Sequence, residues 1–268
     1  MIERVPDAHD PRLADFVELR ERDLVGRQGR FIAEGEVVVR VLLQRSRLRV
    51  RAVLAADKLV DRVAPLVPES VPLLVGSTEL LSSVVGFPLH RGLLACGERA
   101  APPTLEDLIA RAQRLLVLEG IANHDNVGGI FRNAAAFGVD AVLLDDASCD
   151  PLYRKAIRVS AGGALIVPFA RFSDAGALCD QLAAAGLRSL ALTPDPAAQV
   201  LTDVAPRLAA QRCALWLGTE GAGLRPETLA RCEERLAIPM AAGFDSLNVA
   251  VCSGIALYAL SRSKQSET

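Results

Sequence analysis

Three segments of this chain combine glycine with amide, carboxylate or guanidinium side chains where an apolar run ends. The first, residues 123–132, contains Asn126, a glycine pair and Arg132. The second is Leu217-Gly-Thr-Glu-Gly-Ala-Gly-Leu224, and the third runs from Ile238-Pro-Met240 to Ser246-Leu-Asn248. Glycines let a backbone approach a ligand closely, and polar side chains can orient that ligand. Three such segments in order predict one composite pocket, in which the first segment is a polar loop that leads into a helix.

The glycines of the second segment do not match two common phosphate sites. Gly218, Gly221 and Gly223 give the spacing G-x-x-G-x-G, whereas a dinucleotide site has G-x-G-x-x-G after a strand. The chain also lacks the G-x-x-x-x-G-K-[ST] phosphate loop. We therefore expect these glycines either to let the backbone approach a flat or bulky ligand or to form plain turns.

The cysteines and histidines give no metal or disulfide signature. The 6 cysteines are scattered without a C-x-x-C pair, and the chain has only 3 histidines. We therefore expect no metal and a reducing, cytoplasmic setting. The N-terminus lacks the apolar run of a signal peptide, and no apolar stretch reaches the roughly 18 residues that a membrane span needs.

The charge is nearly balanced overall but uneven along the chain. A net charge of −2 argues against a protein that coats nucleic acid through a global positive field. Two stretches, between Glu36 and Asp57 and between Asp150 and Asp174, nevertheless carry basic residues and no acid. These basic residues are Arg40, Arg45, Arg47, Arg49, Arg51, Arg154, Lys155, Arg158 and Arg171. They are candidates for phosphate contacts, and the alternative is a solvated surface.

The motifs need elements to position them, and the length of 268 residues favours two domains. The small residues and double proline at 98–103 are linker-like. They predict a small α/β domain at residues 1–100 and a second domain at residues 104–268. In the first domain we expect strands at 50–55, 72–75 and 92–96 and helices at 34–44 and 77–85.

The second domain alternates apolar strands with helix-length segments. We expect strands at 115–118, 141–144, 166–169, 189–192, 214–217 and 236–238. This alternation predicts a parallel sheet covered on both faces. Ligands of such sheets bind outside the carboxyl ends of the strands, where all three motifs fall. The pattern therefore predicts one site at that edge.

These motifs also carry a family resemblance. The residues are Asn126-x-Gly128-x-x-x-Arg132-x-Ala134-x-x-x-Gly138, Leu217-Gly-x-Glu220-Gly-x-Gly, and Ile238-Pro-Met240 followed by Ser246-Leu-Asn248-Val. They resemble the three motifs of the SpoU (TrmH-type) RNA ribose 2'-O-methyltransferases, of the knotted SPOUT class, over roughly residues 113–262. The N-terminal third resembles the small substrate-binding domain, related to a ribosomal-protein RNA-binding fold, that often precedes this domain.

The resemblance implies a C-terminal domain with a deep trefoil knot that binds S-adenosylmethionine in a bent form. It implies transfer of a methyl group to a ribose 2'-hydroxyl of tRNA or rRNA, with S-adenosylhomocysteine as product and no metal. Gly218, Ile238 and Leu247 would line the cofactor. The residues expected near it are Leu192, Thr193, Leu217, Met240 and Asn248.

The resemblance also assigns roles to polar residues. Arg132 would activate the hydroxyl, and Asn126 and Glu220 would organise the loops around it. Because a guanidinium is essentially always protonated, we favour electrostatic stabilisation by Arg132 over a role as base. Simpler readings remain open: a salt bridge for Arg132, a helix-start carboxylate for Glu220, and N-caps for Ser246 and Asn248.

Two positions depart from the family pattern. Many members have a proline where this chain has His124-Asp125, and a serine where it has Ala250. His124 beside the pocket suggests acid–base chemistry, although a loop histidine is more often a polar contact.

The segment 246–261 carries no charge and has little polar face. Such a helix is buried on more than one side, so we expect it to pack against its own domain and a second subunit. The family's members are dimers, and the resemblance therefore also implies a homodimer.

Two rival functions compete with this interpretation. One is a catalytically silent RNA-binding protein that keeps the knot, against which the intact motifs argue. The other is a nucleotide-dependent oxidoreductase, which the missing dinucleotide fingerprint disfavours.

Overall fold

The chain folds into two compact units in a computed structural model that describes residues 2–17, 29–89, 91–241 and 246–261. The first unit comprises residues 1–101 and 151–166, and the second comprises residues 102–150 and 167–268. This division differs from the expected one, which placed residues 151–166 in the second domain. The reason lies in α7 (Arg154–Val159), whose Ala156 and Ile157 are buried and which packs against β2 of the first unit.

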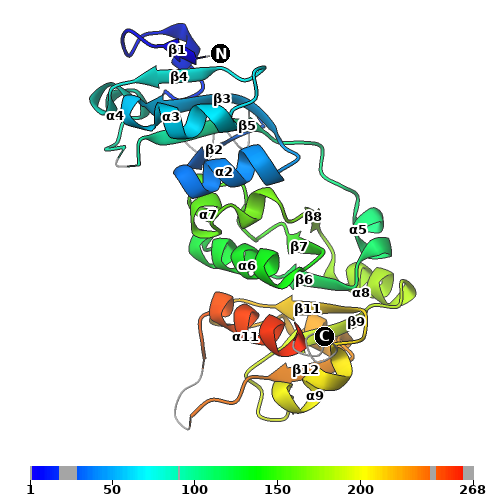
Figure 1. Cartoon of the computed structure of the whole chain (residues 1–268). Coiled ribbons are helices and arrows are strands. Elements are labelled where there is room, and N and C mark those ends of the chain that lie inside the picture. The colour runs from blue at the N-terminus through cyan, green and yellow to red at the C-terminus, as the bar shows by residue number, and fades with distance from the viewer. Residues whose placement is uncertain (1, 18–28, 90, 242–245, 262–268) are drawn as a thin grey trace, which may run out of the picture. The chain divides into compact units, whose positions relative to one another are not determined.

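The first unit contains a mixed five-stranded sheet of order β1-β4-β3-β5-β2 (Figure 1). The first three of these strands run parallel, and β5 is antiparallel to both β3 and β2. Its strands are β1 (Ile2–Arg4), β2 (Arg30–Glu34), β3 (Arg49–Ala56), β4 (Leu73–Gly76) and β5 (Leu93–Glu98). Its helices are η1 (Pro11–Leu13), α2 (Glu36–Arg45), η2 (Asp57–Leu59), α3 (Val60–Val63), η3 (Ala64–Leu66), α4 (Thr78–Val85), α7 and η4 (Gly163–Leu165).

Local chemistry sets the helix boundaries in this unit. The predicted helix at 34–44 begins later, because Glu34 ends β2 and Gly35, at φ +90°, turns the chain before α2. Such a φ is unfavourable for residues with a Cβ. Helix α4 begins after Ser77, whose hydroxyl accepts the N–H of Leu80 at 3.2 Å, and ends at Gly86 in the left-handed region.

The second unit contains a seven-stranded sheet of order β10-β12-β9-β11-β6-β7-β8, and every pair of neighbours is parallel. The predicted parallel α/β sheet is confirmed. Its strands are β6 (Arg114–Leu118), β7 (Ala141–Asp145), β8 (Phe169–Phe172), β9 (Arg188–Leu192), β10 (Gln199–Val200), β11 (Cys213–Leu217) and β12 (Glu234–Ala237). Its helices are α5 (Leu105–Arg111), α6 (His124–Phe137), α8 (Ala175–Ala184), α9 (Leu201–Leu208), α10 (Pro226–Arg231) and α11 (Val249–Ser261).

In the second unit, three predicted segments differ from the structure by two residues or more. The strand expected at 166–169 begins at Phe169, because η4 and Pro168 precede it. Strand β12 begins two residues before the expected 236–238. The polar loop expected at 123–132 is helical from His124 onward, since Asn123 caps α6 by accepting the N–H of Asp125 at 2.8 Å.

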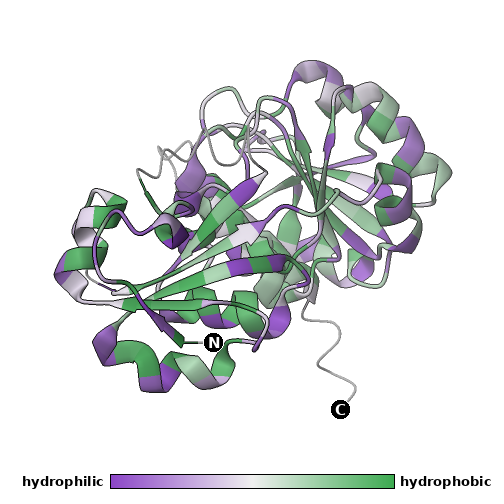
Figure 2. Ribbon diagram, turned by 90° about the horizontal axis from the view of Figure 1, so that it is seen from above, coloured by the Kyte–Doolittle hydropathy of each residue, from purple (hydrophilic) through white to green (hydrophobic). Residues whose placement is uncertain are grey.

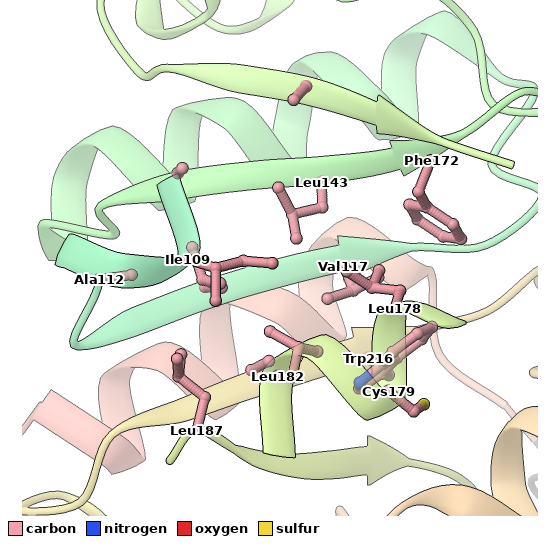
Figure 3. Packing of buried hydrophobic residues seen from close by; sticks show 14 of the residues in the cluster. Ile109, Ala112, Val117, Leu143, Phe172, Leu178, Cys179, Leu182, Leu187 and Trp216 are labelled. Atoms are coloured by element: carbon pink, nitrogen blue, oxygen red, sulfur yellow. The ribbon is translucent and has the colours of Figure 1, made fainter. Parts of the chain in front are cut away.

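The core of the second unit is built of strand side chains covered by helices on both faces of the sheet. On one face, Leu178, Cys179 and Leu182 of α8 point toward the strands (Figure 3). The rings of Phe172 and Trp216 pack edge to face there, with centroids 6.0 Å apart. On the other face α11 packs against α6 and α9. Figure 2 shows the strands as mainly hydrophobic and the helices as mixed. Among the described residues, none of the helices is long and apolar enough to cross a bilayer.

Candidate functional site

A cavity of about 310 Å³ lies in the second unit and is lined by residues that follow β9, β11 and β12 and by the start of α11. These strands are parallel, so their carboxyl ends meet at one edge. The predicted cofactor residues that the structure brings together here are Leu192, Thr193, Leu217, Gly218, Ile238, Met240 and Leu247. Asn248 is not among the lining residues.

Some lining residues were not predicted from the sequence to bind the cofactor. They are Pro194, Thr219, Gly221, Ala222, Gly223, Leu224, Leu229, Ser246, Val249 and Cys252. Glu220, which was predicted to organise the loops, also lines the cavity. Most of the unpredicted lining residues belong to the quoted motifs, so a broader reading of those motifs would have included them. Leu229, on α10, and Cys252, on α11, carried no signal, because they reach the cavity only through the packing of their helices.

The walls of this cavity are mostly apolar. Among the described lining residues, Glu220 has the one charged side chain. Burial raises the pKa of Cys252, so this thiol is neutral at physiological pH. A cavity of this kind accommodates a ligand with a large apolar surface and no net negative charge.

The turn at residues 218–224 folds back on itself. Thr219 and Gly223 exchange two backbone hydrogen bonds of 3.1 Å each, and Gly223 has φ +71°. A Cβ on Gly218 would lie 2.2 Å from the carbonyl carbon of Gly223. Gly218 and Gly223 therefore form a turn, which is one of the two uses expected for these glycines, and both also line the cavity. Gly221 has open space around it.

Three polar side chains from the three motifs meet beside the cavity. The amide nitrogen of Asn126 donates to Glu220 Oε1 at 2.9 Å. The amide nitrogen of Asn248 donates to Glu220 Oε1 at 2.7 Å and to Asn126 Oδ1 at 2.8 Å. We call Asn126, Glu220 and Asn248 the polar trio. It joins the start of α6, the turn after β11 and the start of α11.

Asn248 has two tasks, of which the sequence predicted the capping of a helix. Its Oδ1 accepts the N–H groups of Ala250 at 2.9 Å and Val251 at 3.3 Å, so it is the N-cap of α11. This orientation directs its Nδ2 toward the other two members of the polar trio. Ser246, the other N-cap candidate, is exposed and lies two positions earlier, at the cavity.

The contact between α6 and α11 holds the polar trio together. A Cβ on Gly129 would lie 2.7 Å from the Cβ of Ala250, so a glycine is needed where the helices touch. The Asn133 amide nitrogen donates to the Ala250 carbonyl at 2.7 Å and to Ser253 Oγ at 2.9 Å. Asn133 was missed from the sequence, because its partners lie more than a hundred residues away.

Arg132 does not join the polar trio. It lies six positions after Asn126, which at 3.6 residues per turn places it about 120° around the helix. The side chain is exposed, and it forms no hydrogen bond or ion pair with any described residue. A salt bridge within the described part of the chain is therefore not its role. His124 is the first residue of α6 and is partly exposed, so the expected loop histidine is helical.

Of the nine basic residues that are candidates for phosphate contacts, eight belong to the first unit and Arg171 belongs to the second. Several have partners that the charge pattern did not reveal, because the acids come from other strands. Arg49 lies 3.3 Å from Glu98, and Arg158 lies 3.8 Å from Glu34. Arg40 pairs with Glu36, and Arg154 stacks on Phe87 with 4.2 Å between guanidinium and ring centroid. Arg45, Arg47 and Lys155 are exposed.

Comparison with known proteins agrees with these features. Residues 113–258 match the model of the SpoU rRNA methylase family. An uncharacterized tRNA/rRNA methyltransferase of Mycobacterium bovis is 40% identical over 98% of this chain and 92% of the relative. The 23S rRNA (guanosine-2'-O-)-methyltransferase RlmB of Vibrio cholerae is 30% identical over 82% of this chain and 92% of its own length. The AdoMet-bound rRNA methyltransferase of Sinorhizobium meliloti has the same fold, with a TM-score of 0.76 at 22% identity, covering 97% and 98% of the two chains.

The family match covers the cavity and the polar trio, and the relatives match both units. The three sequence motifs lie within the matched residues, at the carboxyl edge of the parallel sheet. The chain therefore belongs to the SpoU rRNA methylase family of methyltransferase enzymes.

Proposed function

We propose that this protein is an RNA ribose 2'-O-methyltransferase that uses S-adenosylmethionine and acts on tRNA or rRNA. The observation that carries the proposal is the meeting of all three sequence motifs at one cavity, with the polar trio beside it. A relative named as a guanosine 2'-O-methyltransferase supports the ribose as the acceptor. An RNA substrate of this kind supports the expected cytoplasmic location.

The cavity suits S-adenosylmethionine in size and charge. Its volume of about 310 Å³ falls within the range of small-molecule sites, roughly 300–1,000 Å³. When bound, this cofactor supplies an electrophilic methyl group on a positively charged sulfur. No lysine or arginine is among the described lining residues, so no cationic lining side chain among them would repel the positively charged sulfur. Leu192, Ile238 and Leu247 would hold its apolar parts.

The polar trio would keep the cavity in one shape. Each of its three hydrogen bonds joins two different motifs, so none of the motifs can move alone. Positioning of this kind is a main contribution of an enzyme to methyl transfer, since the donor and the acceptor must be aligned. In this proposal Asn126 and Glu220 organise the site without contact with the reacting atoms.

Arg132 would serve the RNA side of the reaction. Its exposed guanidinium has donors to offer to a phosphate or to the forming alkoxide, and these would lower the barrier electrostatically. The hydroxyl proton does not pass to this guanidinium, which is already protonated, and in this proposal it is released to solvent water as the methyl group is transferred.

We further propose that the protein is a homodimer. Val251, Ile255 and Tyr258 recur at helical spacing on α11 and are 50%, 38% and 54% exposed, forming an apolar stripe. A second copy would cover this stripe, and exposed contiguous apolar surface is typical of interfaces. Light or X-ray scattering at micromolar concentration tests this, and a monomeric mass would contradict it. Ile255→Glu is expected to yield monomers.

We propose that the first unit binds RNA. Exposed Arg45 and Arg47 support this, since neither pairs with a described acid. Arg45→Glu together with Arg47→Glu should weaken RNA binding and flatten its salt dependence.

We also propose that the second unit carries a deep trefoil knot. The family and the strand order, in which β12 lies between β9 and β10, support the knot. An experimental chain trace through residues 242–248 tests it.

The central experiment measures methyl transfer from radiolabelled S-adenosylmethionine to total RNA of cells that lack this protein. Arg132→Ala should lower the rate at least about 100-fold while cofactor affinity persists. Arg111→Ala, which removes an exposed arginine at the end of α5, is the matched control and should keep the wild-type rate.

Digestion of the product RNA to nucleosides identifies the acceptor atom. The expected product is a 2'-O-methylated nucleoside. A base-methylated nucleoside would contradict the proposed acceptor, and undiminished turnover by the Arg132 variant would contradict the role of this residue.

A further inference from the structure

One buried carboxylate near the cavity has no task in the function proposed above. Glu119 directly follows β6, is 3% exposed and does not line the cavity. Its Oε2 accepts the backbone N–H of Arg225 at 3.0 Å, and its Oε1 accepts Arg225 Nε at 2.5 Å and the hydroxyl of Thr228 at 2.9 Å. A charge at this depth is costly unless it is paired and hydrogen-bonded, as this one is.

The backbone of Glu119 makes a further bond to the same region. Its N–H donates to the carbonyl of Leu217 at 3.0 Å. Leu217 and Arg225 are the residues immediately before and after the turn at 218–224, and every residue of that turn lines the cavity. Glu119 therefore fastens both ends of the turn, the first through its main chain and the second through its side chain.

Glu119 is itself fixed in place. The N–H of the next residue, Gly120, donates to Asp145 Oδ2 at 3.0 Å, and Arg225 Nη2 reaches the same oxygen at 3.4 Å. Asp145 in turn accepts both the backbone N–H and the hydroxyl of Ser148, at 2.9 and 2.6 Å. We call the hydrogen bonds of Glu119 to Leu217, Arg225 and Thr228 the clasp. The clasp is supported by buried and partly buried hydrogen bonds at the ends of β6 and β7.

We propose that Glu119 is a positioning residue that holds the turn 218–224 in the shape that binds S-adenosylmethionine. The inference rests on the proposed function for the identity of this ligand. A turn held at only one end samples more conformations, and the entropy of ordering it is then paid when the ligand binds. Loss of the clasp should therefore weaken binding without removing any ligand contact.

The first measurement needs no ligand. Hydrogen exchange of the free protein should show faster exchange of the backbone amides in residues 219–225 of Glu119→Ala than of wild type. The matched control is Glu234→Gln, which removes another buried carboxylate of the same unit, 6% exposed and paired with Arg207 and Arg188. This control should leave exchange in the turn unchanged, because Glu234 lies at the opposite end of its strand from the cavity.

The second measurement is calorimetric titration with S-adenosylmethionine. Glu119→Ala should raise its Kd on the order of tenfold, and Glu119→Gln only about threefold, because an amide oxygen can still accept the Arg225 N–H. The Kd of the Glu234→Gln control should stay at the wild-type value even if its melting temperature falls. Should Glu119→Ala fail to fold, Arg225→Ala removes the side-chain bond to Glu119 and the longer bond to Asp145, through a side chain that is 59% exposed. That variant should raise the Kd about twofold to threefold.

Unchanged exchange in the turn, an unchanged Kd for Glu119→Ala, or an equal rise in Kd for the Glu234→Gln control would each overturn the clasp. Faster exchange in Glu119→Ala combined with no binding of S-adenosylmethionine by wild type would support the clasp as a structural device. The same result would refute the proposed ligand, so the two failures are distinguishable.

Discussion

The two edges of the seven-stranded sheet use polar side chains in opposite ways. At the amino edge, arginines bind main-chain carbonyls where helices end. Arg212 donates to the carbonyls of Ile109, Ala110, Ala112 and Ala185, at the ends of α5 and α8. Arg114 donates to Ala209 and Leu260, at the ends of α9 and α11. These cations satisfy carbonyls that have no partner within their helices and complement the negative helix ends.

At the carboxyl edge, side chains bind one another across motifs and leave a cavity between them. Asn126, Glu220 and Asn248 form a closed set of hydrogen bonds, while Glu119 holds the neighbouring turn from behind. We infer from this difference that polar side chains at the amino edge stabilise the fold, whereas those at the carboxyl edge determine the shape of one site. Substitutions at the two edges should therefore separate binding from stability.

The largest effect is expected at Gly218, where no side chain can be accommodated. Gly218→Ala would place a Cβ 2.2 Å from the carbonyl carbon of Gly223, so the main chain of the turn must move. We expect S-adenosylmethionine affinity to fall at least about 100-fold in a calorimetric titration. Gly221→Ala in the same turn is the control, since its Cβ would meet no atom within 4 Å. A similar loss in both variants would mean that the ligand itself, rather than the turn, excludes the Cβ.

The next effect separates the two tasks of Asn248. Asn248→Asp keeps an oxygen that caps α11, because aspartate is as good an N-cap as asparagine. It also replaces the amide that lies 2.7 Å from Glu220 Oε1 with a second negative charge. We expect methyl transfer to fall about 30-fold with little change in melting temperature. Full activity in this variant, together with a loss in Asn248→Ala, would show that only the cap matters.

The sequence was informative wherever a pattern is local. Buried parallel strands read as continuous apolar runs, so β6, β7, β9 and β11 were predicted within one residue of their bounds. The cavity followed from the rule that ligands bind at the carboxyl ends of such strands. The family resemblance added the proposed identity of the ligand, which no spacing could supply.

What the sequence left hidden depends on contacts between distant residues. Glu119 is a single acid after a strand, and only the fold brings Arg225 and Thr228 to it. The basic run that contains Arg49 appeared free of acids, yet Glu98 reaches it from the neighbouring strand β5. The segment 151–166 packs with the first unit although it lies in the middle of the second in sequence. Local patterns carry no information about such partners.

The smallest effect is expected at the amino edge and concerns stability. Glu234 accepts two hydrogen bonds from Arg207, at 2.8 and 2.7 Å, and pairs with Arg188 at 2.8 Å. Glu234→Gln should lower the free energy of unfolding by about 1 to 2 kcal/mol at neutral pH, because hydrogen bonds to a charged group are lost. Cofactor affinity should not change. Trp216 is the only tryptophan of the chain and is buried in this unit, so its fluorescence in urea titrations reports the unfolding.

The difference in free energy of unfolding between wild type and Glu234→Gln should depend on pH if the charge of Glu234 is its cause. Hydrogen bonds from Arg207 hold the pKa of Glu234 below its ordinary value of 4.5, against the opposing effect of burial. A carboxyl whose pKa is lowered by folding stabilises the protein above its unfolded pKa, and that stabilisation is lost as pH falls through the folded pKa. The difference in free energy of unfolding between wild type and Glu234→Gln should therefore be constant from about pH 8 to about pH 6 and shrink below about pH 4.5. A difference that persists undiminished at acid pH would assign the loss to packing of the side chain rather than to its charge.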